Sequence, residues 1–192
     1  MRTNRMTRRA MVLGLAAIPP GLGLAAAAAP AADRPAAKPD ADQEISHTAV
    51  AIHQQIAFQA SRQRVYHALT DSKAFDRVVQ LSDAVNTGMV AAAAAPSQIG
   101  RRPGAAFSLF GGYVSGLQVE LVRDRRIVQV WRAGSWDPGA YSIASFVLAD
   151  EGSGCRLVFD HRGFPDGEAQ HLLEGWHGNY WRPLAKALAQ KG

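Results

Sequence analysis

Hydrophobic and polar residues alternate where the globular part of the chain begins. Across residues 50–58 the even positions are mostly apolar, and the odd positions are small or polar. A period of two places the apolar side chains on one face of an extended chain. This segment is therefore predicted to be a β-strand with one buried face.

Two short helices are predicted to follow this strand. Apolar residues recur at helical spacing within residues 65–69 and again within residues 75–79. Ser61 precedes the first set and can act as its N-cap, and Asp71 or Ser72 can cap the second, because their side-chain oxygens accept hydrogen bonds from free backbone N–H groups.

A run of strands is predicted from about residue 86 to residue 162. Glycine-rich and Asp-containing turn signals divide this region, and connections this short favour antiparallel neighbours. The alanine-rich segment 89–95 is predicted to be a weak strand. The clearer strands are residues 107–110, 114–123, 126–133, 141–148 and 155–161.

The last predicted element is a long helix over residues 168–190. Its apolar residues recur at intervals of three and four, which indicates one buried face. They are Leu172, Leu173, Trp176, Tyr180, Leu184 and Leu188. Pro183 has no N–H to donate to the carbonyl of Asn179, so a kink is predicted there.

This order of elements predicts an α+β, helix-grip architecture, with a curved antiparallel sheet of about six or seven strands around the C-terminal helix. The long helix has to cover the concave face of the sheet. One helix does not fill the hollow of a strongly curved sheet, so a cavity lined by aromatic residues is expected. The candidate lining residues are Phe107, Trp131, Tyr141, Phe159, Trp176 and Tyr180.

The first 32 residues have the order of an export signal. A basic stretch ending in Arg8 and Arg9 precedes a mildly apolar run and then a run of alanines. The paired arginines resemble a twin-arginine signal. Residues 33–46 are predicted to be a linker and residues 47–192 the folded domain. We therefore expect a protein exported to the periplasm or secreted, with no integral membrane segment in its mature form.

Charge argues against a nucleic-acid partner. The net charge is +5, but residues 1–32 hold four arginines and no acid, which leaves +1 for the rest of the chain. The basic character belongs to the export segment and not to a phosphate-binding face.

The single cysteine, Cys155, excludes an internal disulfide and a cysteine-based zinc cluster, and it is expected to be a small buried residue.

The remaining candidate chemistry is sparse. Asp160 and His161 are adjacent in a strand and should point to opposite faces, so they are not expected to pair. An inward-facing His161 is expected to be a satisfied core residue, with contact to a ligand as the alternative. His171, Glu174 and His177 spread around one helix too widely for a metal site. We expect no metal, no cofactor and no assigned catalytic residue.

Several segments together resemble proteins homologous to the C-terminal domain of the activator of the 90-kDa heat-shock protein ATPase. That family lies in the START-like (SRPBCC, Bet v 1-like) superfamily, which implies the helix-grip fold. The resemblance covers about residues 49–190. The segments that carry it are residues 66–75, 107–116, 126–132 and 159–165, Trp136, Gly139 and Tyr141-Ser142, and, in the final helix, Gly175-Trp176, Asn179-Tyr180-Trp181 and Pro183-Leu184.

Three functions are compatible with these features. We expect a non-catalytic domain that binds a small apolar or amphipathic ligand, because the predicted lining is aromatic. An enzyme of cyclase or hydratase type, using His161 and Tyr180 in the same hollow, is the first alternative. The second is a co-chaperone-like module that binds an unknown protein through the outer face of the sheet. Polar groups converging in the hollow favour the enzyme, whereas a filled hollow with an exposed apolar patch favours the module.

Overall fold

The computed structural model describes residues 51–91 and 94–190. The predicted export segment, residues 1–32, and the predicted linker, residues 33–46, lie outside these described residues. Within the described ranges, every helix is too short or too polar to cross a membrane.

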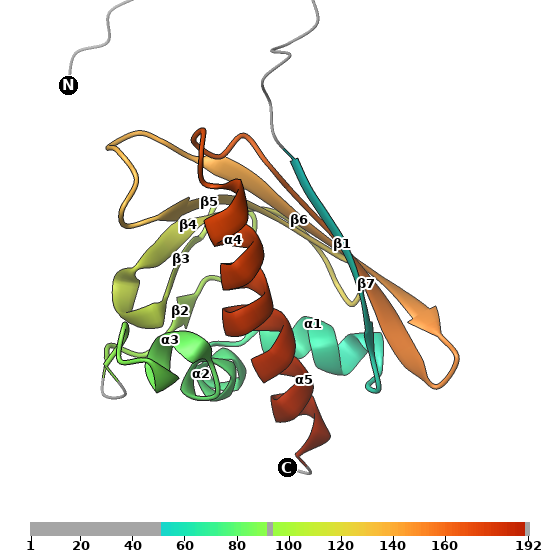
Figure 1. Cartoon of the computed structure of the whole chain (residues 1–192). Helices are drawn as coiled ribbons and strands as arrows, with labels where there is room; N and C mark the ends of the chain where they lie inside the picture. Colours follow the sequence, from blue (N-terminus) through green and yellow to red (C-terminus); the bar gives the residue numbers. More distant parts are fainter. Residues whose placement is uncertain (1–50, 92–93, 191–192) are drawn as a thin grey trace, which may run out of the picture. The chain divides into compact units, whose positions relative to one another are not determined.

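A seven-stranded antiparallel sheet forms the frame of the fold (Figure 1). The strand order is β1-β7-β6-β5-β4-β3-β2, so the first strand pairs with the last one. The strands are β1 (Ala51–Phe58), β2 (Gln98–Ile99), β3 (Ala106–Leu109), β4 (Val114–Val122), β5 (Arg126–Ala133), β6 (Ser142–Glu151) and β7 (Gly154–Arg162). The predicted helix-grip fold is confirmed.

Three short helices follow β1, one more than predicted. They are α1 (Arg62–Thr70), α2 (Ser72–Gln80) and α3 (Asp83–Asn86). The Asp71 carboxylate caps α2 by accepting from the Ala74 N–H at 3.0 Å. Ser61 occupies the N-cap position of α1, but its side chain makes no capping hydrogen bond.

The weak strand predicted at residues 89–95 is wrong for the part of that range that is described. The chain pairs only at β2, which joins β3 over two residues. Two side chains of α2 accept hydrogen bonds from backbone N–H groups in β2 and just before it. Asp76 accepts from Ser97 N at 2.7 Å, and Ser72 Oγ accepts from Ile99 N at 2.9 Å. The segment is therefore fixed to a helix and not to a neighbouring strand.

The C-terminal helix crosses the concave face of the sheet (Figure 1). It runs as α4 (Ala169–Trp176), a π-helical segment (His177–Trp181) and α5 (Arg182–Ala189). The Arg182 N–H bonds to the carbonyl of His177, five residues back. This wider turn lies directly before Pro183, whose ring would clash with the carbonyl of Asn179 in a regular α-helix.

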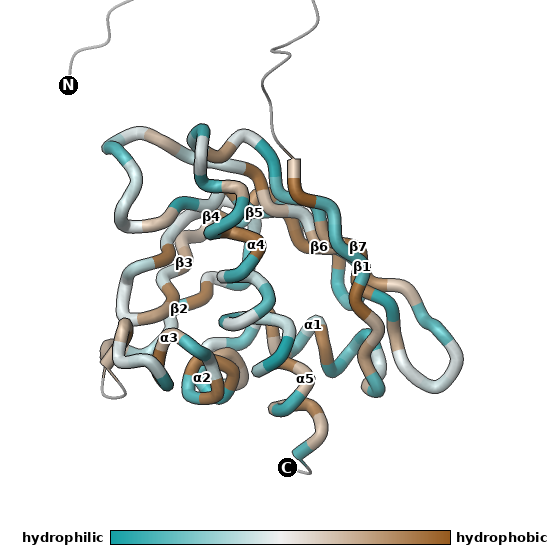
Figure 2. Tube along the Cα trace, in the orientation of Figure 1, coloured by the Kyte–Doolittle hydropathy of each residue, from teal (hydrophilic) through white to brown (hydrophobic). Residues whose placement is uncertain are grey.

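Alternation along the strands separates the core from the outer face. In β7 the odd positions Cys155, Leu157, Phe159 and His161 are buried, whereas the neighbouring even positions are more exposed. Figure 2 shows the same alternation of apolar and polar positions along the chain. The core lies between this inner face and the C-terminal helix.

Candidate functional site

A cluster of aromatic side chains fills most of the space between the sheet and the C-terminal helix. Trp176 lies at its centre, with ring centroids 4.3 Å from Phe159 and 4.2 Å from Tyr180. Trp131 packs against Trp176 at 5.6 Å and Trp181 stacks on it at 5.5 Å. Such pairs stabilise the core beyond the area that they bury. The hollow that the sequence predicts is therefore largely occupied by the protein's own rings.

His161 lies in this cluster with both ring nitrogens engaged. The Trp176 indole N–H donates to His161 Nδ1 at 3.0 Å, and His161 Nε2 lies 2.6 Å from Ser142 Oγ. Ser142 donates its hydroxyl proton to the Trp131 carbonyl at 3.0 Å, so Nε2 carries the imidazole proton and donates to Ser142. These bonds define one neutral tautomer. Burial lowers the pKa of His161 to about 3.

A small pocket remains where the helix meets the inner face of β5. Its volume is about 70 Å³, room for roughly five water-sized groups at ~15 Å³ each. Trp131, Trp176 and Tyr180 form its inner wall, and Met89 and Tyr113 lie among the residues toward its mouth. Met89 is 64% exposed, so a large apolar side chain stands in solvent beside the pocket.

Two buried polar atoms on the pocket wall lack hydrogen-bond partners within the described residues. They are the Trp131 indole nitrogen and the Tyr180 hydroxyl. Burial raises the pKa of Tyr180 well above its usual value, and the nearby Trp131 N–H, as a hydrogen-bond donor, acts in the opposite direction. The two groups are therefore close, but outside hydrogen-bond geometry. An oxygen atom placed between them could accept from the indole and accept from, or donate to, the phenol.

Some of the predicted lining residues lie at the pocket, and others are buried elsewhere. Trp131, Trp176 and Tyr180 line the pocket. Phe159 and His161 are fully buried behind them in the aromatic cluster. Phe107 is buried as well, but its ring lies over Gly116 and not at the pocket, since a Cβ on Gly116 would approach that ring to 2.8 Å.

Tyr141 lies outside the core. It is 49% exposed, and the Arg132 guanidinium sits 5.6 Å from its ring centroid. The reason is strand register: Trp131 pairs directly with Ser142, and paired residues in antiparallel strands share a face. The even positions of β6 therefore face inward, and Tyr141, one residue before Ser142, points outward.

Several residues at the pocket were missed from the sequence. Phe110 begins a 3-10 turn, Val90 lies in the loop after α3, and Gly175 belongs to α4. The aromatic character of Phe110 and the resemblance at Gly175 were available signals. The place of Val90 depends on how the loop folds back, because its N–H bonds to the Ala84 carbonyl at 2.8 Å.

The other candidate polar groups do not converge. Asp160 lies on the outer face, where its carboxylate meets His53 Nδ1 at 2.9 Å, so it points away from His161. His171 and His177 are exposed on the C-terminal helix. Among the described residues, no three His, Cys, Asp or Glu side chains are arranged to hold a metal ion.

The outer face of the sheet carries exposed apolar side chains. Leu117 pairs with Val130 and Val130 with Ile143, which places the three in one row across β4, β5 and β6. Leu117 is 46% and Ile143 is 44% exposed. Val119 and Val147 extend this patch.

Comparison with known proteins identifies the sequence family. The profile described as "Activator of Hsp90 ATPase homolog 1-like protein" matches residues 59–189. An uncharacterized protein of Schizosaccharomyces pombe is 37% identical over 90 residues, which is 47% of this chain and 27% of that protein. The human activator of 90 kDa heat shock protein ATPase homolog 1 is 28% identical over 94 residues, 49% of this chain and 28% of that protein. The matches therefore span less than a third of these relatives.

Solved structures show the same fold. A crystal structure described as an HSP90 activator from Plasmodium falciparum superimposes with a TM-score of 0.60 at 19% identity. The match covers 73% of this chain and 95% of that one. At this identity the likeness concerns the fold alone.

Proposed function

The chain belongs to the family of activator of Hsp90 ATPase homolog 1-like proteins, and from that premise we propose that it binds a small amphipathic molecule at the pocket between α4 and β5. One observation carries the proposal. Two residues that line the free space, Trp131 and Tyr180, each carry a buried polar atom without a hydrogen-bond partner among the described residues. A buried polar group without a partner is costly, and a ligand oxygen would remove that cost.

The bound group has to be slender. A volume of about 70 Å³ is far below the ~300 Å³ or more of most drug-sized ligand sites. An apolar chain end or a small ring therefore enters, while the rest of the molecule lies across the mouth beside Met89 and Tyr113. Met89 has three rotatable side-chain bonds, so this wall can adapt to ligands of different width.

We further propose that the domain works outside the cytoplasm. The basic, apolar and alanine-rich order of residues 1–32 supports export. A ligand taken up there would be a molecule of the cell envelope or the medium.

Gly175 offers a sharp test of the pocket. A Cβ added at Gly175 would meet only the Asn179 side-chain nitrogen, at 3.9 Å, so the backbone at this position accepts a side chain without a clash at Cβ. We expect Gly175→Leu to fill the mouth and to weaken binding of the amphipathic dye anilinonaphthalene sulfonate about tenfold, since excluding roughly two methylene groups costs ~1.6 kcal/mol. Gly175→Ala is the matched control, because it changes helix propensity while leaving the mouth open.

The dye's fluorescence titration decides between the outcomes. Equal affinity in Gly175→Leu and Gly175→Ala would place dye binding elsewhere and refute the pocket. Mass spectrometry of small molecules released from the natively purified protein then identifies the natural class of ligand.

A second candidate function rests on the outer face. The aromatic filling of the core and the row Leu117, Val130 and Ile143 are what a protein-binding module would show. The relatives' names suggest stimulation of an Hsp90-type ATPase, although such a partner would not meet an exported protein. Steady-state ATP hydrolysis by an Hsp90-type chaperone tests this candidate. Stimulation by the protein that is lost in Ile143→Glu would favour it over ligand binding.

The cyclase or hydratase alternative gains no support from the site. His161 is neutral, has both nitrogens engaged and does not line the pocket. Tyr180 lines the pocket as a buried phenol, and the other titratable lining residues, Tyr113 and His171, are exposed toward solvent.

A further inference from the structure

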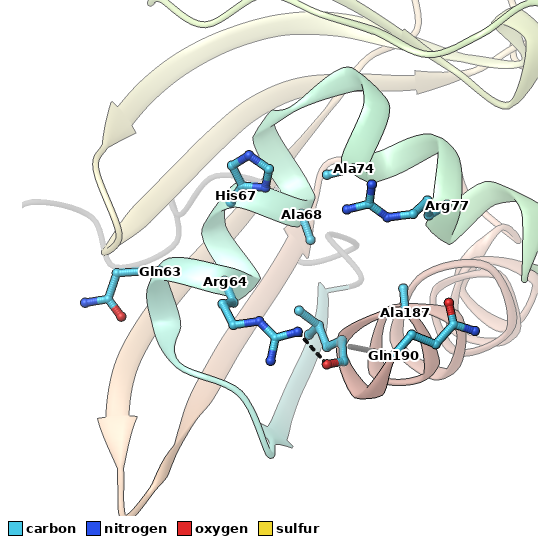
Figure 3. A pocket seen from close by; sticks show the side chains of 9 residues that line it. Gln63, Arg64, His67, Ala68, Ala74, Arg77, Ala187 and Gln190 are labelled. Carbon is cyan, nitrogen blue, oxygen red and sulfur yellow. Dashed lines mark hydrogen bonds between the residues drawn. The ribbon is translucent and has the colours of Figure 1, made fainter. Parts of the chain in front are cut away.

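A broad groove lies between α1, α2 and α5, away from the proposed ligand pocket (Figure 3). Its volume is about 580 Å³. Ala68, Ala74 and Ala187 contribute short side chains from the three helices, which leaves the space open. Figure 3 shows Arg64 and Arg77 extending from α1 and α2 beside these alanines. The groove thus has an apolar floor and basic sides.

The basic character continues over α1 into a second depression. That depression has a volume of about 550 Å³ and shares Gln63 and His67 with the first. Arg101 and Arg102 line it. The two depressions form one track, which we call the basic track, running from Arg77 past His67 to Arg101.

The cations of the basic track are largely uncompensated. Within the described ranges, Arg77, Arg101 and Arg102 take part in no ion pair, and Arg64 donates only to the Leu188 carbonyl, at 2.7 Å. The one acid lining the track is Asp124, which lies 3.7 Å from Arg123.

Asp71 is the other carboxylate near the basic track. Its pKa is lowered, chiefly because it accepts a hydrogen bond from the Ala74 backbone, with smaller effects of His67 and Arg101. The carboxylate is therefore occupied in capping α2 and does not neutralise the arginines as a group.

From this geometry we infer that the basic track is a docking site for an acidic peptide segment of a protein partner. Each guanidinium is exposed, and a single exposed ion pair is weak because water screens it. A small free anion would therefore gain little. An extended segment can place several carboxylates against arginines of both depressions while an apolar side chain rests on Ala68 and Ala74, so its contacts add up.

A direct binding experiment tests the docking site. The probe is a short fluorescein-labelled peptide in which glutamate alternates with leucine, titrated with the full chain and followed by fluorescence anisotropy at low and at high salt. We expect saturable binding that weakens with salt, since exposed charge pairs are screened. A peptide with glutamine in place of glutamate should not bind.

Charge reversal locates the contact. We expect the double variant Arg77→Glu with Arg101→Glu to bind the peptide at least about tenfold more weakly, which corresponds to ~1.4 kcal/mol. Arg162→Glu is the matched control, because Arg162 is exposed on β7 and lies outside both depressions. Circular dichroism verifies that each variant is folded.

Three results would overturn the inference: no binding of the acidic peptide, equal loss of binding in the control variant, or undiminished binding by the double variant.

A separate experiment uses vesicles that contain an anionic lipid. Sedimentation with such vesicles in the absence of peptide binding would assign the track to a membrane surface instead. Dye binding at the proposed ligand pocket should be unaffected by Arg77→Glu. The docking site and the ligand pocket can therefore be refuted separately.

Discussion

Acidification should destabilise this protein through one buried histidine. His161 is fully buried and neutral, with a pKa of about 3 in the folded state. In the unfolded chain the same imidazole has its ordinary pKa of ~6.5. The folded pKa is the lower of the two, so the unfolded state binds the extra proton first. The stabilising contribution of the neutral histidine is complete above about pH 6.5 and is lost as the pH falls toward 3.

The magnitude follows from the gap between the two pKa values. Each pH unit within the gap changes the free energy of unfolding by ~1.36 kcal/mol. Lowering the pH from about 7.5 to about 4.5 crosses two units of the gap and should remove about 2.7 kcal/mol. That loss is a large fraction of the stability of an ordinary domain, ~5–15 kcal/mol.

Urea denaturation followed by tryptophan fluorescence measures the effect, because Trp176 and Trp131 lie beside His161. We expect His161→Gln to be less stable at neutral pH, since it breaks the bonds to Trp176 and Ser142. Its stability should also vary less with pH than that of the parent. His177→Gln is the control, because His177 is an exposed histidine on the C-terminal helix. An identical loss on acidification in His161→Gln and in the parent would refute the reasoning.

Three further predictions address the core, the sheet and the export segment. Trp176→Ala should lower the free energy of unfolding by ~3–5 kcal/mol, as truncation of buried aromatic residues does; an unchanged melting temperature would contradict its central place. Gly116→Ala should cost about 3 kcal/mol or more, because a Cβ there would lie 1.8 Å from the Val130 carbonyl oxygen; a urea midpoint equal to that of the parent would show that β4 and β5 can separate freely. Replacing Arg8 and Arg9 by lysines should leave the protein in the cytoplasmic fraction, if the paired arginines act as an export signal; normal delivery would indicate another route.

The sequence predicts the sheet well wherever side chains alternate strongly. The alternation over residues 50–58 predicted both a strand and its buried face, because one polar and one apolar face leave a single favourable orientation, and residues 155–161 were predicted as a strand. Residues 89–95 gave no such contrast: alanine packs equally poorly on either face. There the outcome depended on Asp76 and Ser72, whose side chains bind the following backbone.

The site was harder to predict than the fold, for a geometric reason. Tyr141 was a candidate lining residue because it is aromatic, but the pairing of Trp131 with Ser142 turns Tyr141 outward. His161 depends on Trp176, Ser142 and the Trp131 carbonyl, which lie in different elements. A sequence shows which residues of one strand share a face. Which face points to the core depends on the register with the neighbouring strands, and turns and bulges set that register.

The polarity of the pocket wall bears on the choice between a solid core and a binding site. Phenylalanine would fill nearly the volume of Tyr180 without bringing a hydroxyl into the interior. A buried polar group without a partner costs ~1–3 kcal/mol, so a core built only for stability gains nothing from Tyr180 or from the free Trp131 N–H. Both groups belong to residues that line the pocket of about 70 Å³ beside Trp176. Other buried atoms without a partner among the described residues, such as Trp136 Nε1 and Gln118 Nε2, belong to residues outside this lining, so a missing partner alone does not mark a site. What favours a ligand is the open space beside Trp131 and Tyr180, where an oxygen-bearing group has room to bind.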